Sequence, residues 1–306
     1  MASSPVAEGI ELAVPHLPSL EMDRSNWQRW LSAAITIALF VAILLKLRNF
    51  GFSNAMGTLP VKPLFWLAFA AYYLALPFSD WLIFRRLWKL PKGGFAALIR
   101  KLVSNEVLFG YSGEVYFYSW ARRHAPIVGA PFGAIKDVSI LSAIAGNFIT
   151  LAMLGLAWPL VQTISPQFHG RAVFASAAMI ITMSMVVFVF KNRLFSLPSA
   201  ALREIFAIHV ARLVATTFLS GLMWHVALPQ VPLVWLVLLA TLQLLVTRLP
   251  FVPNKDLVFA SLAIFLIGHD SEVATLIAMI AASILAVHLI LGGLLILSEA
   301  LEARAG

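Results

Sequence analysis

The stretch SNEVLFGYSGEVYFYSWARRHAPIVGAPFGAIKD, residues 104–137, combines charged, aromatic and small residues more densely than any other part of the chain. Its four glycines and two prolines would interrupt a long helix, because glycine is flexible and proline removes a backbone donor. The pattern predicts roughly two or three short helices joined by irregular backbone. Its charged residues are Glu106, Glu114, Arg122, Arg123, Lys136 and Asp137.

Long apolar segments surround this stretch, so its charges lie close to membrane depth. Charged side chains there usually face a bundle interior or a watery cavity. Irregular backbone is tolerated at that depth only where protein buries it or where it lines a cavity. We therefore expect a re-entrant or interfacial helical segment near residues 95–136. A solvated loop whose charges follow the topology rule stays open as the alternative.

Composition indicates a membrane protein. The chain has 306 residues, of which 61% are hydrophobic and 12% charged, and its mean hydropathy is +0.90. The net charge of +8 suits anionic lipid head groups at a cytoplasmic surface rather than nucleic acid, because the basic residues lie in short loops beside apolar segments. The absence of cysteine excludes disulfides and thiolate chemistry.

Hydropathy predicts an all-α fold, a polytopic helical bundle with about eight spans. Residues 1–26, rich in proline, serine and acidic residues, are expected to be a mobile cytosolic tail without the pattern of a cleavable signal peptide. Residues 27–306 would form a single membrane domain. The expected spans are residues 31–45, 64–84, 138–160, 173–190, 206–228, 231–246, 257–268 and 273–297, of which the segment 257–268 is short.

Basic residues predict the orientation. With both termini in the cytoplasm, the outer segments hold only Lys46, Arg48, Lys62 and Arg171, and nearly all other basic residues lie inside. Arg100 and Lys101 belong to the inner set. A multi-pass protein of a bacterial inner membrane is expected.

The order of these motifs resembles the transmembrane region of lysylphosphatidylglycerol synthases and of related stand-alone, flippase-like membrane proteins. The matching features are Arg85-Arg86, Asn105, Gly113-Glu114, Arg122-Arg123, Lys136-Asp137 and the late loop LPFVPNKDLVFA. Phe109, Tyr111 and Ser112 stand where that family commonly has proline and arginine, and Asn254, Lys255 and Asp256 stand where its late loop has glycines and a glutamate. The soluble aminoacyl-transferase domain of the full synthases is not in this sequence, so aminoacyl transfer is not expected.

The resemblance implies lipid handling: translocation or presentation of an anionic phospholipid, a glycolipid or a hopanoid-type lipid for envelope biogenesis. The expected partners are membrane lipids and an envelope-glycan or lipid synthase, with no nucleic acid. Two other hypotheses stay open. One is an integral membrane transferase acting on a lipid-linked sugar, and the other is a non-catalytic membrane subunit of an envelope-glycan assembly.

Candidate head-group residues follow from their chemistry. Arginine forks match phosphate geometry, so Arg122 and Arg123, with Lys136, are candidates for an anionic head group. Glu114 and Asp137 would hold these arginines in place or bind the amine group of a zwitterionic lipid, unless the charges only neutralise one another. Arg212 lies within a predicted span and is a further candidate for a cavity wall.

The late loop supplies the remaining candidates, Asn254, Lys255 and Asp256. These residues precede a short apolar helix, where Asp256 would cap the helix or the free amides would meet an anion, and capping is the favoured interpretation. The sequence contains no P-loop, no nucleophile elbow and no histidine pattern typical of a metal site. No catalytic residue, metal or cofactor is therefore predicted, and the chemistry leans away from an enzyme.

Overall fold

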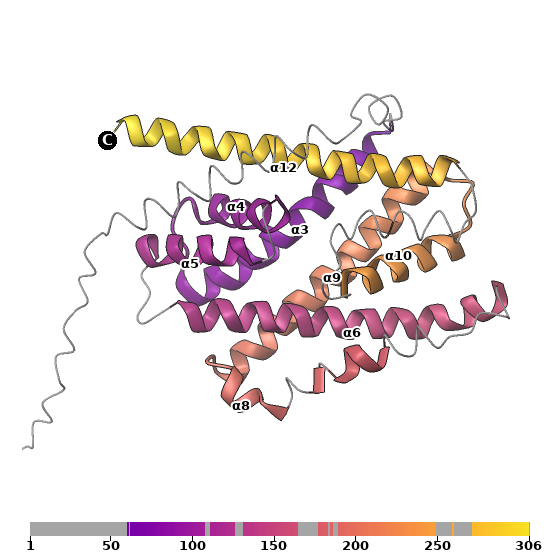
Figure 1. Cartoon of the computed structure of the whole chain (residues 1–306), viewed down its shortest axis with the longest axis horizontal. Coiled ribbons are helices and arrows are strands. Elements are labelled where there is room, and N and C mark those ends of the chain that lie inside the picture. The colour runs from indigo at the N-terminus through magenta and orange to yellow at the C-terminus, as the bar shows by residue number, and fades with distance from the viewer. Residues whose placement is uncertain are drawn as a thin grey trace, which may run out of the picture.

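A computed structural model describes residues 60, 62–107, 111–125, 131–164, 177–182, 184–185, 189–248, 259 and 271–305. These residues form helices, turns and irregular segments, with no strand among them. With the labels of Figure 1, the helices are α3 (Pro63–Trp88), α4 (Gly94–Val107), α5 (Ser112–His124), α6 (Phe132–Ile164), α8 (Lys191–Leu194), α9 (Ser199–Ala227), α10 (Leu233–Arg248) and α12 (Ser271–Ala305). The all-helical class predicted from hydropathy is confirmed for this part of the chain.

Three helices are long and apolar enough to cross a membrane: Pro63–Trp88, Phe132–Pro159 and Ser199–Ala227, with mean hydropathies of 1.4, 1.9 and 1.6. They correspond to the predicted spans 64–84, 138–160 and 206–228. Two shorter apolar helical segments, Val234–Thr247 and Ser283–Leu295, overlap the predicted spans 231–246 and 273–297. The described part of the chain is thus helical, and the length and composition of these three helices indicate a membrane protein.

Several predictions lie outside the described residues. These are the tail 1–26, the spans 31–45 and 257–268 apart from Phe259, much of the span 173–190, and the late-loop candidates Asn254, Lys255 and Asp256.

The helix ends follow local chemistry. Helix α3 starts with Pro63 in the first turn, where a missing backbone donor costs nothing. It ends at Lys89, which adopts a left-handed conformation (φ 49°) and donates its N–H to the carbonyl of Arg85. Arg85 and Arg86 lie in the last turn, where positive charge interacts favourably with the helix dipole. Arg86 also forms an ion pair with Glu204 at the start of α9.

Helix α9 is central to the packing, because it contacts α3, α6 and α10. In Figure 1, α12 runs along the top of the view and α6 runs below it, α3 lies between them, and α9 crosses α6 with its start near α8. The short helices α4 and α5 pack against each other, and α4 also contacts α3 and α12.

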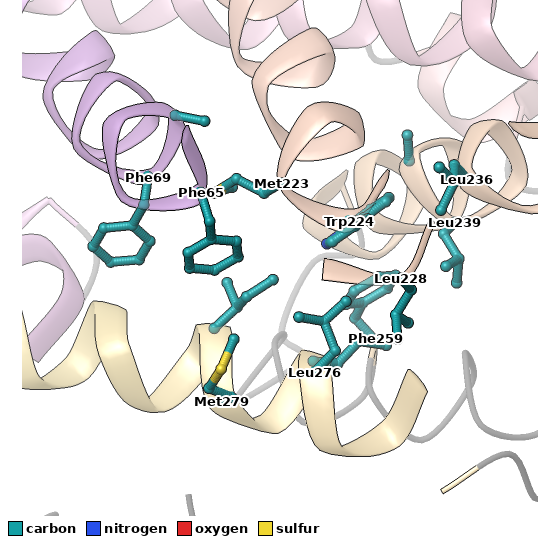
Figure 2. Packing of buried hydrophobic residues seen from close by; sticks show 14 of the residues in the cluster. Phe65, Phe69, Met223, Trp224, Leu228, Leu236, Leu239, Phe259, Leu276 and Met279 are labelled. Atoms are coloured by element: carbon teal, nitrogen blue, oxygen red, sulfur yellow. The ribbon is translucent and has the colours of Figure 1, made fainter. Parts of the chain in front are cut away.

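A core of buried apolar side chains joins helices that are distant in sequence. Phe65 and Phe69 of α3 pack with Met223 and Trp224 of α9, and with Met279 of α12 (Figure 2). Burying a large apolar side chain contributes about 1.5–3 kcal/mol in water, although between lipid-embedded helices packing replaces much of this term. This core holds the ends of α3, α9, α10 and α12 together, and leaves the opposite ends of α3 and α9 to meet α4 and α6.

Helices α4 and α5 form an antiparallel hairpin. Arg100 stacks over the ring of Tyr116 at 4.7 Å, and the hydroxyl of Ser112 donates to the carbonyl of Ser104 at 2.7 Å, so residue pairs run in opposite directions. At the crossing, the N–H of Gly113 donates to Asn105 Oδ1 at 2.7 Å. A Cβ on Gly113 would clash with the backbone carbonyl of Lys101, so only glycine permits this approach.

Candidate functional site

A buried ion cluster joins this hairpin to α3. Lys101 Nζ of α4 donates a 2.7 Å hydrogen bond to Asp80 Oδ2 of α3, and lies 3.4 Å from Glu114 Oε1 of α5. Asp80 and Lys101 are 3% and 7% exposed. A buried charge is costly unless it is paired, so one ammonium between two carboxylates stabilises all three helices in this arrangement.

The charge of Lys101 is favoured by its surroundings. Burial alone would lower the pKa of the ammonium group, but the nearby carboxylates of Asp80 and Glu114 outweigh burial and raise the pKa above the ordinary lysine value. Lys101 is therefore a cation at any physiological pH.

The ion cluster forms one wall of a cavity of about 310 Å³, here called the polar cavity. His209 and Arg212 of α9 also line this cavity. Arg212 Nη2 donates to the hydroxyl of Ser142 on α6 at 3.1 Å, which fixes one side of the guanidinium group. Helices α3, α4, α5, α6 and α9 thus all contribute side chains to one polar cavity.

Several buried polar atoms of this cavity have no hydrogen-bond partner among the described residues. They are Glu114 Oε2, Arg212 Nε and the ring nitrogens of His209, although the backbone of Val138 lies beside that ring. Native proteins satisfy most buried polar groups with protein, water or ligand. The polar cavity is therefore prepared to accept a polar molecule or group.

A second cavity of about 690 Å³, here called the apolar cavity, adjoins the first. Four residues line both: Tyr111, Glu114, Ser139 and Ala143. The rest of its wall is mostly apolar, from Val115 and Tyr118 of α5 and from Phe132, Ile135, Ile140 and Ile144 of α6. Asn147, hydrogen-bonded to Ser184 at 3.1 Å, also lines it. Each volume falls in the range of about 300–1,000 Å³ typical of small-molecule sites.

The wall of the apolar cavity has exposed side chains. Tyr111, Val115 and Phe132 are 71%, 49% and 63% exposed. Tyr111 also adopts a left-handed backbone conformation, with φ 73°, just before α5. Such a conformation is unfavourable for a non-glycine residue and is often found where a side chain contacts a ligand. These exposed side chains place part of the wall of the apolar cavity at the protein surface.

Three of the residues singled out from the sequence line these cavities. Glu114 lines both, Lys136 lines the apolar cavity and Arg212 lines the polar cavity. Arg122 and Arg123 lie on the exposed surface of α5, away from both walls. Together with His124 they occupy its last turn, where cations complement the helix dipole.

Asp137 has a different environment, because its side chain is fully buried. Its Oδ2 accepts the backbone N–H groups of Ser196 and Leu197 at 2.7 and 2.8 Å. Lys136 Nζ lies 3.5 Å from Asp137 Oδ1 and also donates to the carbonyl of Leu194. The pair Lys136-Asp137 therefore holds the loop before α9 against the start of α6, which positions the helix that carries Arg212.

Sequence reasoning did not assign Asp80, Lys101 or Tyr111 to the site. Asp80 carried a usable signal, because an acidic residue within a hydrophobic span is a functional candidate by default. Lys101 carried none, since a basic residue in an interfacial helix is equally expected from the topology rule. Only the packing of α4 on α3 brings the two residues together.

No protein-family model matches the sequence, and searches of curated proteins and of solved structures gave no match either.

Proposed function

We propose that this chain is a flippase-like, lipid-handling membrane protein that takes one amphipathic lipid at a time into the two adjoining cavities. The head group would occupy the polar cavity, and at least one acyl or isoprenoid chain would lie in the apolar cavity. The observation that carries this proposal is the shared wall of Tyr111, Glu114, Ser139 and Ala143 between a charged space and an apolar one.

The separation of polar and apolar walls matches the two parts of a lipid. A water-soluble metabolite would leave the larger, apolar cavity without an apolar complement, and a purely apolar molecule would leave Arg212 and Glu114 unsatisfied. The resemblance of the Gly113-Glu114 and Lys136-Asp137 motifs to flippase-like membrane proteins supports the same conclusion.

The setting we propose is a bacterial inner membrane, with both termini in the cytoplasm. The support is the distribution of basic residues along the chain, which favours this orientation over its reverse. Reporter fusions to the C-terminus, one active only in the cytoplasm and one active only in the periplasm, test the orientation. Activity of the periplasmic reporter would overturn it.

Reconstitution of the purified chain into vesicles with head-group-labelled lipids tests the function. The wild-type chain should move label between leaflets faster than empty vesicles do. Glu114→Gln, which changes the shared wall, should lose most of this activity. Glu204→Gln makes the same chemical change at an exposed ion pair on α9 and should keep it. Lipid movement no faster than in empty vesicles for the wild type would contradict translocation.

A further inference from the structure

The polar cavity has a balanced set of charges. Among the described residues that line it, Asp80 and Glu114 are the acidic groups, and Lys101 and Arg212 are the basic groups. With the imidazole of His209 uncharged, these charges sum to zero. A head group with a net charge would leave the buried site unbalanced, and an unbalanced buried charge is costly. The balance therefore favours a head group of zero net charge.

The buried polar atoms of the cavity that lack a hydrogen-bond partner are also balanced between donors and acceptors. Lys101 and Asp80 satisfy each other through their 2.7 Å hydrogen bond. The buried atoms left over are a guanidinium donor, Arg212 Nε, a carboxylate acceptor, Glu114 Oε2, and the two ring nitrogens of His209, which in a neutral imidazole are one donor and one acceptor. The complementary ligand must offer an acceptor, best an anion, to the first and a donor, best a cation, to the second.

On the basis of the proposed function, we propose that the lipid is a zwitterionic aminophospholipid, with its phosphate at Arg212 and its primary ammonium group at Glu114. Arginine pairs well with phosphate, through charge-assisted hydrogen bonds. A primary ammonium group donates three hydrogen bonds, so it satisfies Glu114 Oε2.

Other head groups fail at one of the two positions. A bare phosphomonoester places an anion beside Glu114, and an uncharged sugar leaves the Arg212 guanidinium without a counter-charge. A glycerol head group offers hydroxyl donors to Glu114 but leaves the lipid with a net negative charge. A trimethylated amine keeps the charge balance but has no N–H to donate to Glu114.

The test is native mass spectrometry of the purified full chain with four phospholipids of identical acyl chains. Their head groups are ethanolamine, choline, glycerol and a bare phosphate. The ethanolamine lipid should bind about tenfold or more tightly than the other three, the difference expected for one charge-assisted hydrogen bond. Glu114→Gln should remove the preference for ethanolamine over choline, while the exposed-site control Glu204→Gln keeps it.

The outcomes separate this inference from the proposed function. Retention of no phospholipid at all by the wild-type chain would overturn both. Binding without head-group preference, or tighter binding of the glycerol or bare-phosphate lipid, would overturn the inference and leave lipid binding intact. A preference for ethanolamine that survives Glu114→Gln would also overturn it, because recognition would then lie elsewhere. The binding of the four lipids to the wild-type chain tests the head-group preference even if the Glu114 variant does not fold.

Discussion

Lys101 and Asp80 meet in a 2.7 Å hydrogen-bonded ion pair that links α4 to α3. The two residues are 21 positions apart in sequence, and both are almost completely buried. Glu114 of α5 completes the cluster on the other side of Lys101. The pair therefore attaches the α4–α5 hairpin, which carries much of the cavity wall, to a membrane-spanning helix.

Removing the ammonium group should destabilise the protein strongly. In Lys101→Gln, the buried carboxylate of Asp80 and the partly buried carboxylate of Glu114 lose their counter-ion, and breaking a buried pair typically costs about 3–5 kcal/mol. Thermal unfolding in detergent should show a clear loss of Tm. The double variant Asp80→Asn/Lys101→Gln should recover part of it, because one uncompensated charge is gone. Additive losses in the double variant would contradict a direct pair.

The pH dependence of this stabilisation follows from the raised pKa of Lys101. A group whose pKa is raised on folding contributes stability that is fully present below its unfolded pKa and is lost as pH rises through the folded one. The Tm difference between wild type and Lys101→Gln should therefore stay constant from neutral pH to about 10, near the unperturbed lysine pKa. A difference that already shrinks near pH 8 would contradict the prediction.

Position 113, where α5 crosses α4, should tolerate no residue larger than glycine. Gly113→Ala would push a methyl group into the carbonyl of Lys101, and overpacking of this kind costs about 1–3 kcal/mol. Gly221→Ala is the matched control, because nothing lies within 4 Å of the added atom and alanine favours a helix by about 1 kcal/mol over glycine. Thermal unfolding should show a lower Tm than the wild type for Gly113→Ala and not for Gly221→Ala. An equal Tm for both variants would exclude a tight crossing.

Asp137 should matter for the order of the loop before α9. Asp137→Ala removes the acceptor of two backbone N–H groups, at Ser196 and Leu197. Hydrogen exchange, read by mass spectrometry on peptides covering this loop, should become faster by tenfold or more, since hydrogen bonds to a charged group contribute about 1.5–3 kcal/mol each. Glu204→Gln, at the exposed start of the next helix, should leave the loop unchanged. Unchanged exchange in the alanine variant would contradict the anchoring role.

Hydropathy predicted the three helices that are long and apolar enough to cross a membrane, because long apolar runs are a clear signal. It did not predict the residues at which these helices begin and end. Helix α6 begins at Phe132 and α9 at Ser199, several residues before the predicted spans. The additional turns carry the charged residues Lys136, Asp137 and Glu204, which a hydropathy window excludes although they are helical. A hydropathy window reports residence in the membrane, whereas the backbone hydrogen bonds that define a helix continue beyond it.

The candidate site was only partly accessible to sequence reasoning. Glu114 was found because a charge between glycine and aromatic residues near membrane depth is unusual. The Arg122-Arg123 pair gave the same signal, yet it lies on an exposed helix end. No periodicity could have distinguished the two, because the distinction depends on which face of α5 packs against α4, and that is a tertiary property.

The continuity of the polar and apolar cavities is the central claim, and Ala143 tests it most directly. Its small side chain lines both cavities, so Ala143→Phe would fill the junction. Ala152, exposed on the same helix and outside both walls, provides the control Ala152→Phe. Native mass spectrometry of gently purified protein should find a bound lipid in the wild type and in Ala152→Phe, and none in a folded Ala143→Phe. Equal retention of the same lipid by all three proteins would contradict a lipid site across this junction.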